Sequence, residues 1–324
     1  MGQKAAPRKG TWARVVESVY RRISPKSKIA VGISGGADSV VLAEALCRLG
    51  ANPLLLHFNH RWRGRTAEAD ARWVQGWGKK RKLRVVLGRA DQAGRTGEGE
   101  ARETRWKFFE KAMRSEKRNQ LWLAHQSDDQ AETVLMQLLR VAGPEGLAGM
   151  GPTSARGHFQ VVRPLLEFSG AEMRQAAREA GLSWREDKTN EDPRSWRVRI
   201  RKKVFPFLAK TYGRDVRAAL ARTAEILSGE TEFWKQEIGK IPKHPDVRLW
   251  RSKPVAWQRR AIRIWLAEQG FDGPNFSEVE GVRRLIGGGQ TAFWQLRHGA
   301  GVRRSRSKLF CLNKMGLIAK GNLR

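Results

Sequence analysis

Residues 29–39, IAVGISGGADS, have the composition of an anion-binding turn. The run 29–33 is apolar and rich in β-branched residues, as in a buried strand, and a helical pattern begins at Ala37. Glycines between a strand and a helix let the backbone approach a phosphate, while free N–H groups and the helix dipole point toward it. Ser34 and Ser39 can add hydroxyl donors. The stretch therefore predicts a phosphate site.

Asp38 stands inside this turn, although a carboxylate repels phosphate. A carboxylate beside a polyphosphate suits Mg²⁺, so Asp38 is the candidate metal ligand. The string lacks the lysine of G-x-x-x-x-G-K-[ST] and is not G-x-G-x-x-G. It resembles instead the S-G-G-x-D-S pyrophosphate loop of the N-type ATP pyrophosphatases, enzymes that adenylate a substrate and release pyrophosphate. An ordinary glycine turn between strand and helix is the alternative interpretation.

A second string, AHQSDDQAET at 124–133, carries two carboxylates at helical spacing. His125 ends a predicted strand, and Asp129 and Glu132 lie three residues apart on one face of the helix that follows. Two carboxylates near a phosphate site suit Mg²⁺ binding or proton transfer. The alternative is helix capping by Asp128 with dipole complementation by Asp129.

The elements that must position these strings alternate between strand and helix. Strands are expected at 29–33, 54–58, 83–87, 121–124 and 159–163, and helices at 37–45, 66–77, 100–113, 128–141 and 170–181. This alternation predicts an α/β fold with a doubly wound, mostly parallel sheet. Because ligands of such sheets bind at the carboxyl ends of the strands, residues 34–39, 57–60 and 125–129 should share one rim.

The chain has 324 residues, enough for two domains. We expect an ATP-binding catalytic domain over 1–212, then a linker helix and a smaller basic C-terminal domain over 213–324. Lys and Arg number 63 against 32 Asp and Glu, a net charge of +31. Such an excess predicts a polyanionic partner, and the alternative is a generally basic proteome.

Composition also excludes several classes of protein. There is no run of about eighteen apolar residues, so no membrane span is expected. The first ten residues are basic but lack an apolar signal core, so secretion is not expected. Cys47 and Cys311 form no pair at metal-binding or redox spacing. Together these features favour a protein of the reducing cytoplasm.

Taken in order, the motifs resemble the tRNA(Ile)-lysidine synthetase family, whose members convert the cytidine at the first anticodon position of an isoleucine tRNA to lysidine. The resemblance covers nearly the whole chain. It rests on SGGADS at 34–39, LHFNHRWRG at 56–64, EARETRW at 100–106, AHQSDDQAET at 124–133, GLAGM at 146–150, RPLL at 163–166, EDKTN at 186–190 and RVRIR at 197–201. It implies that the chain uses ATP, Mg²⁺ and L-lysine on tRNA(Ile) with a CAU anticodon, and it leaves open whether the enzyme is a homodimer.

The resemblance also implies roles for individual residues. The ATP-binding loop is matched by Ser34, Gly35, Gly36, Ala37, Asp38 and Ser39. The residues implied to be catalytic are Asp38, which would help hold Mg²⁺, Arg105, His125, Asp129 and Glu132. The residues implied to line the approach of the tRNA are Asp187, Asn190, Arg197 and Arg201. We further expect the charged segment 183–201 and the C-terminal domain to contact the tRNA body.

These residue types suit the implied chemistry. The C2 oxygen of cytosine would attack the α-phosphate of ATP, and Mg²⁺, backbone N–H groups and Arg105 would stabilise the charge that develops. The ε-amine of lysine would then displace AMP after losing a proton to a carboxylate. The chain departs from the family pattern at Asn59, Gln126 and Val198, which affects the detailed roles nearby but not the class of reaction.

Three other functions compete with this one. A tRNA-thiolating relative would need paired cysteines, which this chain lacks. A synthetase acting on a small acidic substrate fits poorly with the charge of +31. A non-catalytic RNA-binding relative would be expected to lose Asp38, Asp129 or Glu132, and all three are present.

Overall fold

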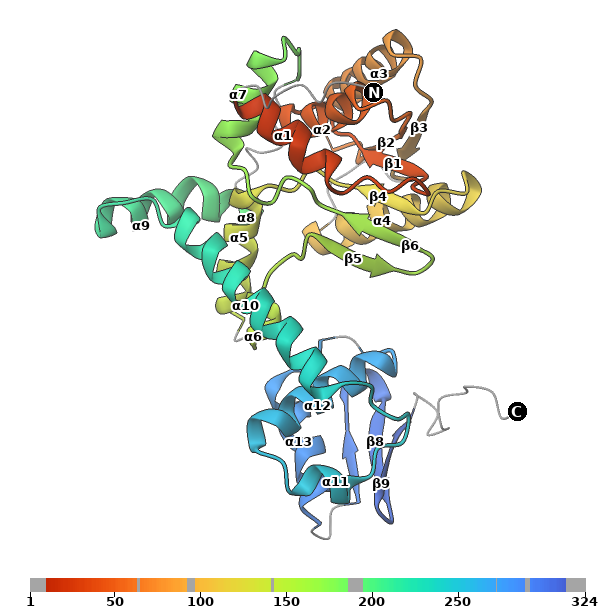
Figure 1. Cartoon of the computed structure of the whole chain (residues 1–324), viewed down its shortest axis with the longest axis vertical. Helices are drawn as coiled ribbons and strands as arrows, with labels where there is room; N and C mark the ends of the chain where they lie inside the picture. Colours follow the sequence, from red (N-terminus) through yellow and green to blue (C-terminus); the bar gives the residue numbers. More distant parts are fainter. Residues whose placement is uncertain are drawn as a thin grey trace, which may run out of the picture. The chain divides into compact units, whose positions relative to one another are not determined.

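A computed structural model describes residues 10–62, 65–91, 97–140, 143–185, 195–271, 273–288 and 292–312. The chain divides into two compact units (Figure 1). Unit 1 comprises Met1–Leu138 and Gly149–Ala224, and unit 2 comprises Leu139–Ala148 and Glu225–Arg324. The last boundary along the chain, after Ala224, falls inside a single helix, α10 (Arg217–Ile238), where a linker helix is expected.

Unit 1 contains a six-stranded sheet in the order β3-β2-β1-β4-β6-β5. The strands are β1 (Ile29–Gly32), β2 (Leu54–Asn59), β3 (Val85–Arg89), β4 (Gln120–Trp122), β5 (Thr153–Arg156) and β6 (Phe159–Val162). Every neighbouring pair is parallel except β5 with β6, so β5 is an antiparallel edge strand. The predicted doubly wound, mostly parallel α/β fold is confirmed.

Both faces of this sheet are covered by helices, because successive strand residues point to opposite sides. Ile29 and Val31 join the core formed with α1 (Thr11–Tyr20), α2 (Ala37–Arg48), α3 (Arg65–Lys80) and α7 (Gly170–Glu179). Ala30 joins the opposite core, where Trp106 and Met113 of α4 (Glu98–Ser115) are buried. A strand that is buried on both faces must be apolar throughout, which explains the continuous apolar run in the sequence.

The rest of unit 1 is helical. It consists of α5 (Ser127–Leu138), α8 (Trp196–Arg199), the π-helix η2 (Ile200–Val204), α9 (Phe205–Tyr212) and the first residues of α10. Ile200 and Phe205 are buried against Ala131 of α5 in a small core of their own. This packing brings α8 and η2 alongside α5.

Unit 2 packs helices on a three-stranded antiparallel sheet in the order β7-β8-β9. Its elements are α6 (Pro144–Leu147), α11 (Val247–Arg251), α12 (Val255–Glu268), α13 (Phe276–Gly287), β7 (Phe293–Gln295), the 3-10 turn η3 (Arg297–Gly299), β8 (Gly301–Ser305) and β9 (Lys308–Leu312). The buried Arg260 of α12 donates to Glu145 of α6 at 2.6 Å, so a segment inserted between α5 and β5 belongs to unit 2. None of the helices in the described ranges is long and apolar enough to cross a lipid bilayer.

Replacing Gly281 tests how closely α13 packs on β7. A Cβ at this position would lie 1.9 Å from the Trp294 ring, so Gly281→Ala forces the indole or the helix to move. We expect a loss of about 1–3 kcal/mol in the free energy of unfolding, measured by thermal or urea denaturation. Gly287→Ala in the same helix is the control, because a Cβ there meets nothing within 4 Å. Equal stability of the two variants would contradict the tight packing.

Candidate active site at the carboxyl edge of the sheet

The turn between β1 and α2 is held by its own serine side chains. Ser39 Oγ accepts from the Ser34 N–H at 3.2 Å and donates to the Gly36 carbonyl at 3.0 Å. The Gly36 N–H donates to Ser34 Oγ at 3.2 Å. Gly35 has a φ of +97°, which favours glycine over any residue with a Cβ. The turn is therefore preorganised.

The amino end of α2 has the properties of an anion site. Among the described residues no side chain caps this helix, so the N–H groups of its first turn, which starts at Ala37, are not satisfied by a cap. The Ser34 residue is exposed, so its hydroxyl can reach a ligand. Just before the turn, the Ile33 carbonyl oxygen lies 2.8 Å from Nδ1 of the buried His57 on the neighbouring strand β2.

Three carboxylates from two helices gather at this edge. Burial, followed by the negative charge of Asp129, raises the pKa of Asp38 to about 7. Burial also raises the pKa of Asp129, opposed by a hydrogen bond from the Gln126 N–H at 3.1 Å. The side chain of Glu132 has no exposed surface, and burial raises its pKa against the opposing charge of Arg201. The amino ends of α2 and α5 thus place negative charge together.

Arg197 and Arg201 lie directly against these acids. Arg201 Nε donates to Glu132 Oε1 at 2.7 Å, and its Nη2 is 3.5 Å from Asp129 Oδ1. Arg197 Nη1 is 3.5 Å from Glu132 Oε2. The two arginines come from α8 and η2, where a spacing of four residues presents both side chains to α5. Asp187 and Asn190 lie outside the described residues.

A second group of side chains, near Arg197, is positively charged. Burial, and then Arg163 and Arg105, lower the pKa of His125 well below its ordinary value, so its imidazole is neutral at pH 7. Burial lowers the pKa of Arg105 to about 10. Arg105 Nε, His125 Nδ1 and Arg163 Nε are all buried and make no hydrogen bond to any described residue. The two guanidinium nitrogens are buried donors without partners, which fits an anionic ligand.

Some residues near the acids were not among the predicted site residues. Arg163 directly follows β6, and its Nη1 donates to the Gly151 carbonyl at 3.0 Å. Asp128 accepts from the Gly170 N–H at 3.2 Å and lies 3.4 Å from Arg217 Nη1. The position of Arg163 at the end of a predicted strand is a signal for its place on the rim, whereas nothing local marks Arg217.

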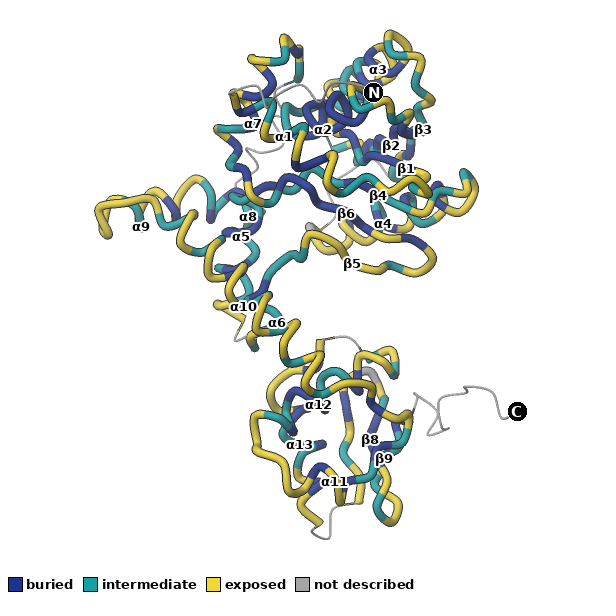
Figure 2. The backbone as a smooth tube through the Cα atoms, viewed as in Figure 1, coloured by how far each residue is buried: buried dark blue, intermediate teal, exposed yellow. Residues whose placement is uncertain are grey.

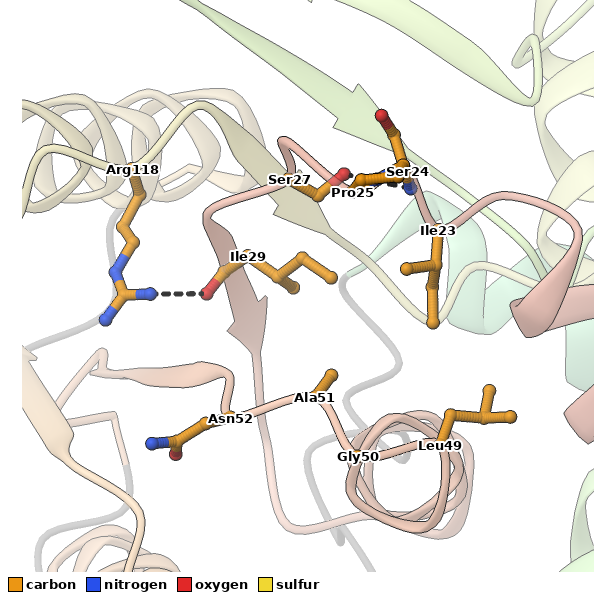
Figure 3. A pocket seen from close by; sticks show the side chains of 10 residues that line it. All are labelled: Ile23, Ser24, Pro25, Ser27, Ile29, Leu49, Gly50, Ala51, Asn52 and Arg118. Atoms are coloured by element: carbon orange, nitrogen blue, oxygen red, sulfur yellow. Dashed lines mark hydrogen bonds between the residues drawn. The ribbon is translucent and has the colours of Figure 1, made fainter.

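A pocket of about 250 Å³ lies at the other end of β1. It is lined by the turn that precedes β1, by residues 49–52 after α2 and by Arg118 (Figure 3). Arg118 Nη1 is 3.5 Å from the Ile29 carbonyl oxygen at the start of the strand. Because the serine-glycine turn leaves the carboxyl end of β1, this pocket is separate from the acid cluster.

The loop, the acid cluster and the sheet order define a PP-loop protein. Residues 9–208 match the family described as PP-loop domain, and residues 246–310 match the TilS substrate binding domain. A solved structure, the U34-tRNA thiolase NcsA from Methanococcus maripaludis, shares the fold with a TM-score of 0.54, 18% identity, and coverage of 68% of this chain and 80% of that chain.

Curated relatives named tRNA(Ile)-lysidine synthase are similar over most of this chain. The protein from Thermosynechococcus vestitus is 33% identical, covering 82% of this chain and 81% of its own length. The protein from Solibacter usitatus is 35% identical over 80% of this chain, and the one from Bacillus subtilis is 35% identical over 74%. This chain spans only 61% and 54% of those two relatives. The chain belongs to the tRNA(Ile)-lysidine synthase family, which confirms the resemblance predicted from its motifs.

The raised pKa of Asp38 makes stability depend on pH. Its carboxyl ionises at about 7 in the folded chain and at its ordinary 3.8 when unfolded, so the folded state loses stability as pH rises through that window. We expect Asp38→Asn to raise the melting temperature at pH 7.5, and by less at pH 5. Calorimetry at both pH values measures this, with Glu103→Gln on the exposed side of α4 as the control. An equal shift at both pH values would contradict the argument.

Proposed function

We propose that this chain ligates L-lysine to C2 of the cytidine at the first anticodon position of tRNA(Ile) with a CAU anticodon. ATP would adenylate the base, and the products would be lysidine, AMP and pyrophosphate. The observation that carries the proposal is the acid cluster of Asp38, Asp129 and Glu132 beside the preorganised 34–39 loop, in a member of this family. The loop supplies an anion site, and the acids supply charge at the same edge.

ATP would bind with its phosphates against the loop and the amino end of α2. Asp38 fits the coordination of Mg²⁺, because its buried carboxylate lies near the negative charge of Asp129 and needs a compensating cation. When bound, the ion would neutralise charge on the departing pyrophosphate. No group of three or more His, Cys, Asp or Glu side chains in the described residues forms a metal cage, so phosphate oxygens and water would complete the coordination.

Adenylation of the base is supported by the positively charged group of side chains near Arg197. The Arg105 guanidinium stays charged at neutral pH, because its lowered pKa is still about 10. Its buried Nε has no hydrogen-bond partner among the described residues, and the positive charge of the guanidinium would stabilise the charge that develops on the α-phosphate. His125 would be neutral and would act as a hydrogen-bonding group.

Transfer of lysine needs a proton acceptor, and the contacts separate the two acids of α5. Glu132 is fully buried and bound closely by Arg201 at 2.7 Å, which makes it a positioning residue. Asp129 is 3.5 Å from Arg201 Nη2 and has a raised pKa. We therefore assign Asp129 to binding the lysine ammonium and accepting its proton.

The thiolation alternative finds little support in the cysteines. Cys47 on α2 and Cys311 on β9 belong to different units, and burial raises the pKa of each thiol. Neither is therefore an activated thiolate. Unit 2, with its excess of Lys and Arg and its match to a substrate-binding domain, is assigned to holding the tRNA body. The proposed reaction belongs in the cytoplasm, and a homodimer stays a prediction.

The test combines purified protein, ATP, Mg²⁺, radiolabelled lysine and an unmodified tRNA(Ile) transcript with a CAU anticodon. Wild-type protein should release pyrophosphate only with the tRNA and should attach the label to it. Asp129→Asn should lower lysine attachment by about 10²–10⁴-fold, because the proton acceptor is lost. Glu103→Gln should retain wild-type activity.

Two outcomes would contradict the proposal. Release of pyrophosphate without attachment of lysine would keep the adenylation but require another nucleophile. Full lysine attachment by Asp129→Asn would remove Asp129 from the reaction.

A further inference from the structure

The segment formed by α8, η2 and α9 has two contrasting faces. Its inner face buries Val198, Ile200 and Phe205 and directs Arg201 to the acids of α5. On the other side Trp196 is 53% exposed and Phe207 is 65% exposed. Exposed aromatic side chains that lie close together on one segment can mark an interaction site. Figure 2 shows α9 coloured as exposed over most of its length.

The exposed side carries cations between the aromatic rings. Trp196, Lys203, Phe207 and Lys210 follow one another along this segment, and all four are exposed. We call these four residues the outer face. The Arg199 guanidinium lies 4.2 Å from the centre of the Trp196 ring, which holds the indole and adds charge beside it.

The charge of this segment indicates which kind of partner it can bind. Residues 195–214 contain four arginines and three lysines and neither Asp nor Glu. A second copy of the chain docking here by twofold symmetry would bring lysines against lysines. A polyanion whose units present flat π-surfaces satisfies both the cations and the rings, as single-stranded nucleic acid does.

We propose that the outer face binds unpaired nucleotides of the substrate RNA, with bases stacked on Trp196 and Phe207 and phosphates held by Lys203 and Lys210. This rests on the proposed function, and it adds the surface that holds the anticodon loop. The same helical segment carries Arg197 and Arg201, which touch the acid pair. Nucleotides held on the outer face would therefore lie next to the site where the neighbouring base reacts.

The test measures binding of a fluorescein-labelled anticodon stem-loop of tRNA(Ile) to the full chain by fluorescence anisotropy. Phe207→Ala should weaken binding about 5- to 150-fold if the ring stacks on one base. Phe207→Leu, which keeps an apolar side chain, should remain weak. Joint replacement of Lys203 and Lys210 by Gln should lower the slope of log affinity against log salt by about 1.4, since two phosphate contacts are lost.

The matched control is Tyr20→Ala. Tyr20 is 62% exposed at the end of α1 and precedes Arg21 and Arg22, so it presents a similar ring near cations on another helix. The Tyr20→Ala variant should bind the stem-loop with the same affinity as wild type. Thermal unfolding of each variant checks that the fold is kept.

Several results would overturn the proposal. If Phe207→Ala and the double lysine variant both bind the stem-loop with wild-type affinity, the outer face does not bind RNA. If Phe207→Leu binds the stem-loop as tightly as wild type, the Phe207 side chain makes an apolar contact and does not stack on a base. If the outer-face variants change the sedimentation coefficient of the protein and leave its RNA affinity unchanged, the outer face is a contact between copies of the chain.

Lysine attachment by wild-type protein separates this inference from the proposed function. Attachment that is unaffected by the outer-face variants, with unchanged RNA binding, would contradict the outer face alone. RNA binding that depends on Phe207 in a protein unable to attach lysine would support the outer face and contradict the proposed reaction.

Discussion

The parallel pairing of β1 with β2 and β4 is the constraint on which the site depends. Ala30 lies opposite Leu54 on one side and Leu121 on the other, so the three strands run in register toward one edge. Each chain segment that leaves this edge must turn into a helix that covers the sheet. The loop 34–39 and the start of α5 therefore meet there, although about ninety residues separate them.

Bringing the two helix ends together places buried carboxylates close to one another, which is electrostatically unfavourable. The amino ends of α2 and α5 carry Asp38 and Asp129, and burial raises the pKa of both. Arg201 compensates part of this negative charge, while Arg105 and Arg163 leave buried donors unpaired. A site with crowded buried carboxylates and unpaired buried guanidinium nitrogens suits a charged ligand, because ligand atoms can supply the missing partners.

The segment 196–212 has one side against the acids and one side open to solvent. Its π-turn η2 carries Arg201 against Glu132, while Phe207 of α9 faces outward. π-turns are frequent at functional sites. One helical segment thus holds the acid pair on its inner side and offers a basic aromatic surface on its outer side. Such an arrangement fits a reaction in which binding of a macromolecule must precede chemistry on one of its bases.

Features that depend on local pattern can be predicted from the sequence alone. The apolar run before the 34–39 loop predicts a doubly buried strand, and the alternation of strands and helices predicts the sheet that is observed. Asp38, Asp129 and Glu132 could be selected because their neighbours in the chain already show a phosphate turn and a helix start. The motif series likewise indicated the family. The antiparallel strand β5 and the short helix α6 were not anticipated, since neither has enough residues for a clear period.

Only the tertiary structure decided which distant side chains meet. Arg197 and Arg201 were expected on the approach of the RNA, and the structure places them on acids more than sixty residues earlier. Arg217 reaches Asp128, and Glu145 joins unit 2 through Arg260, with no local signal for either contact. An ion pair depends on how two helices pack, and packing is set by the summed burial of many apolar residues. Charge and spacing along the chain carry no information about that sum.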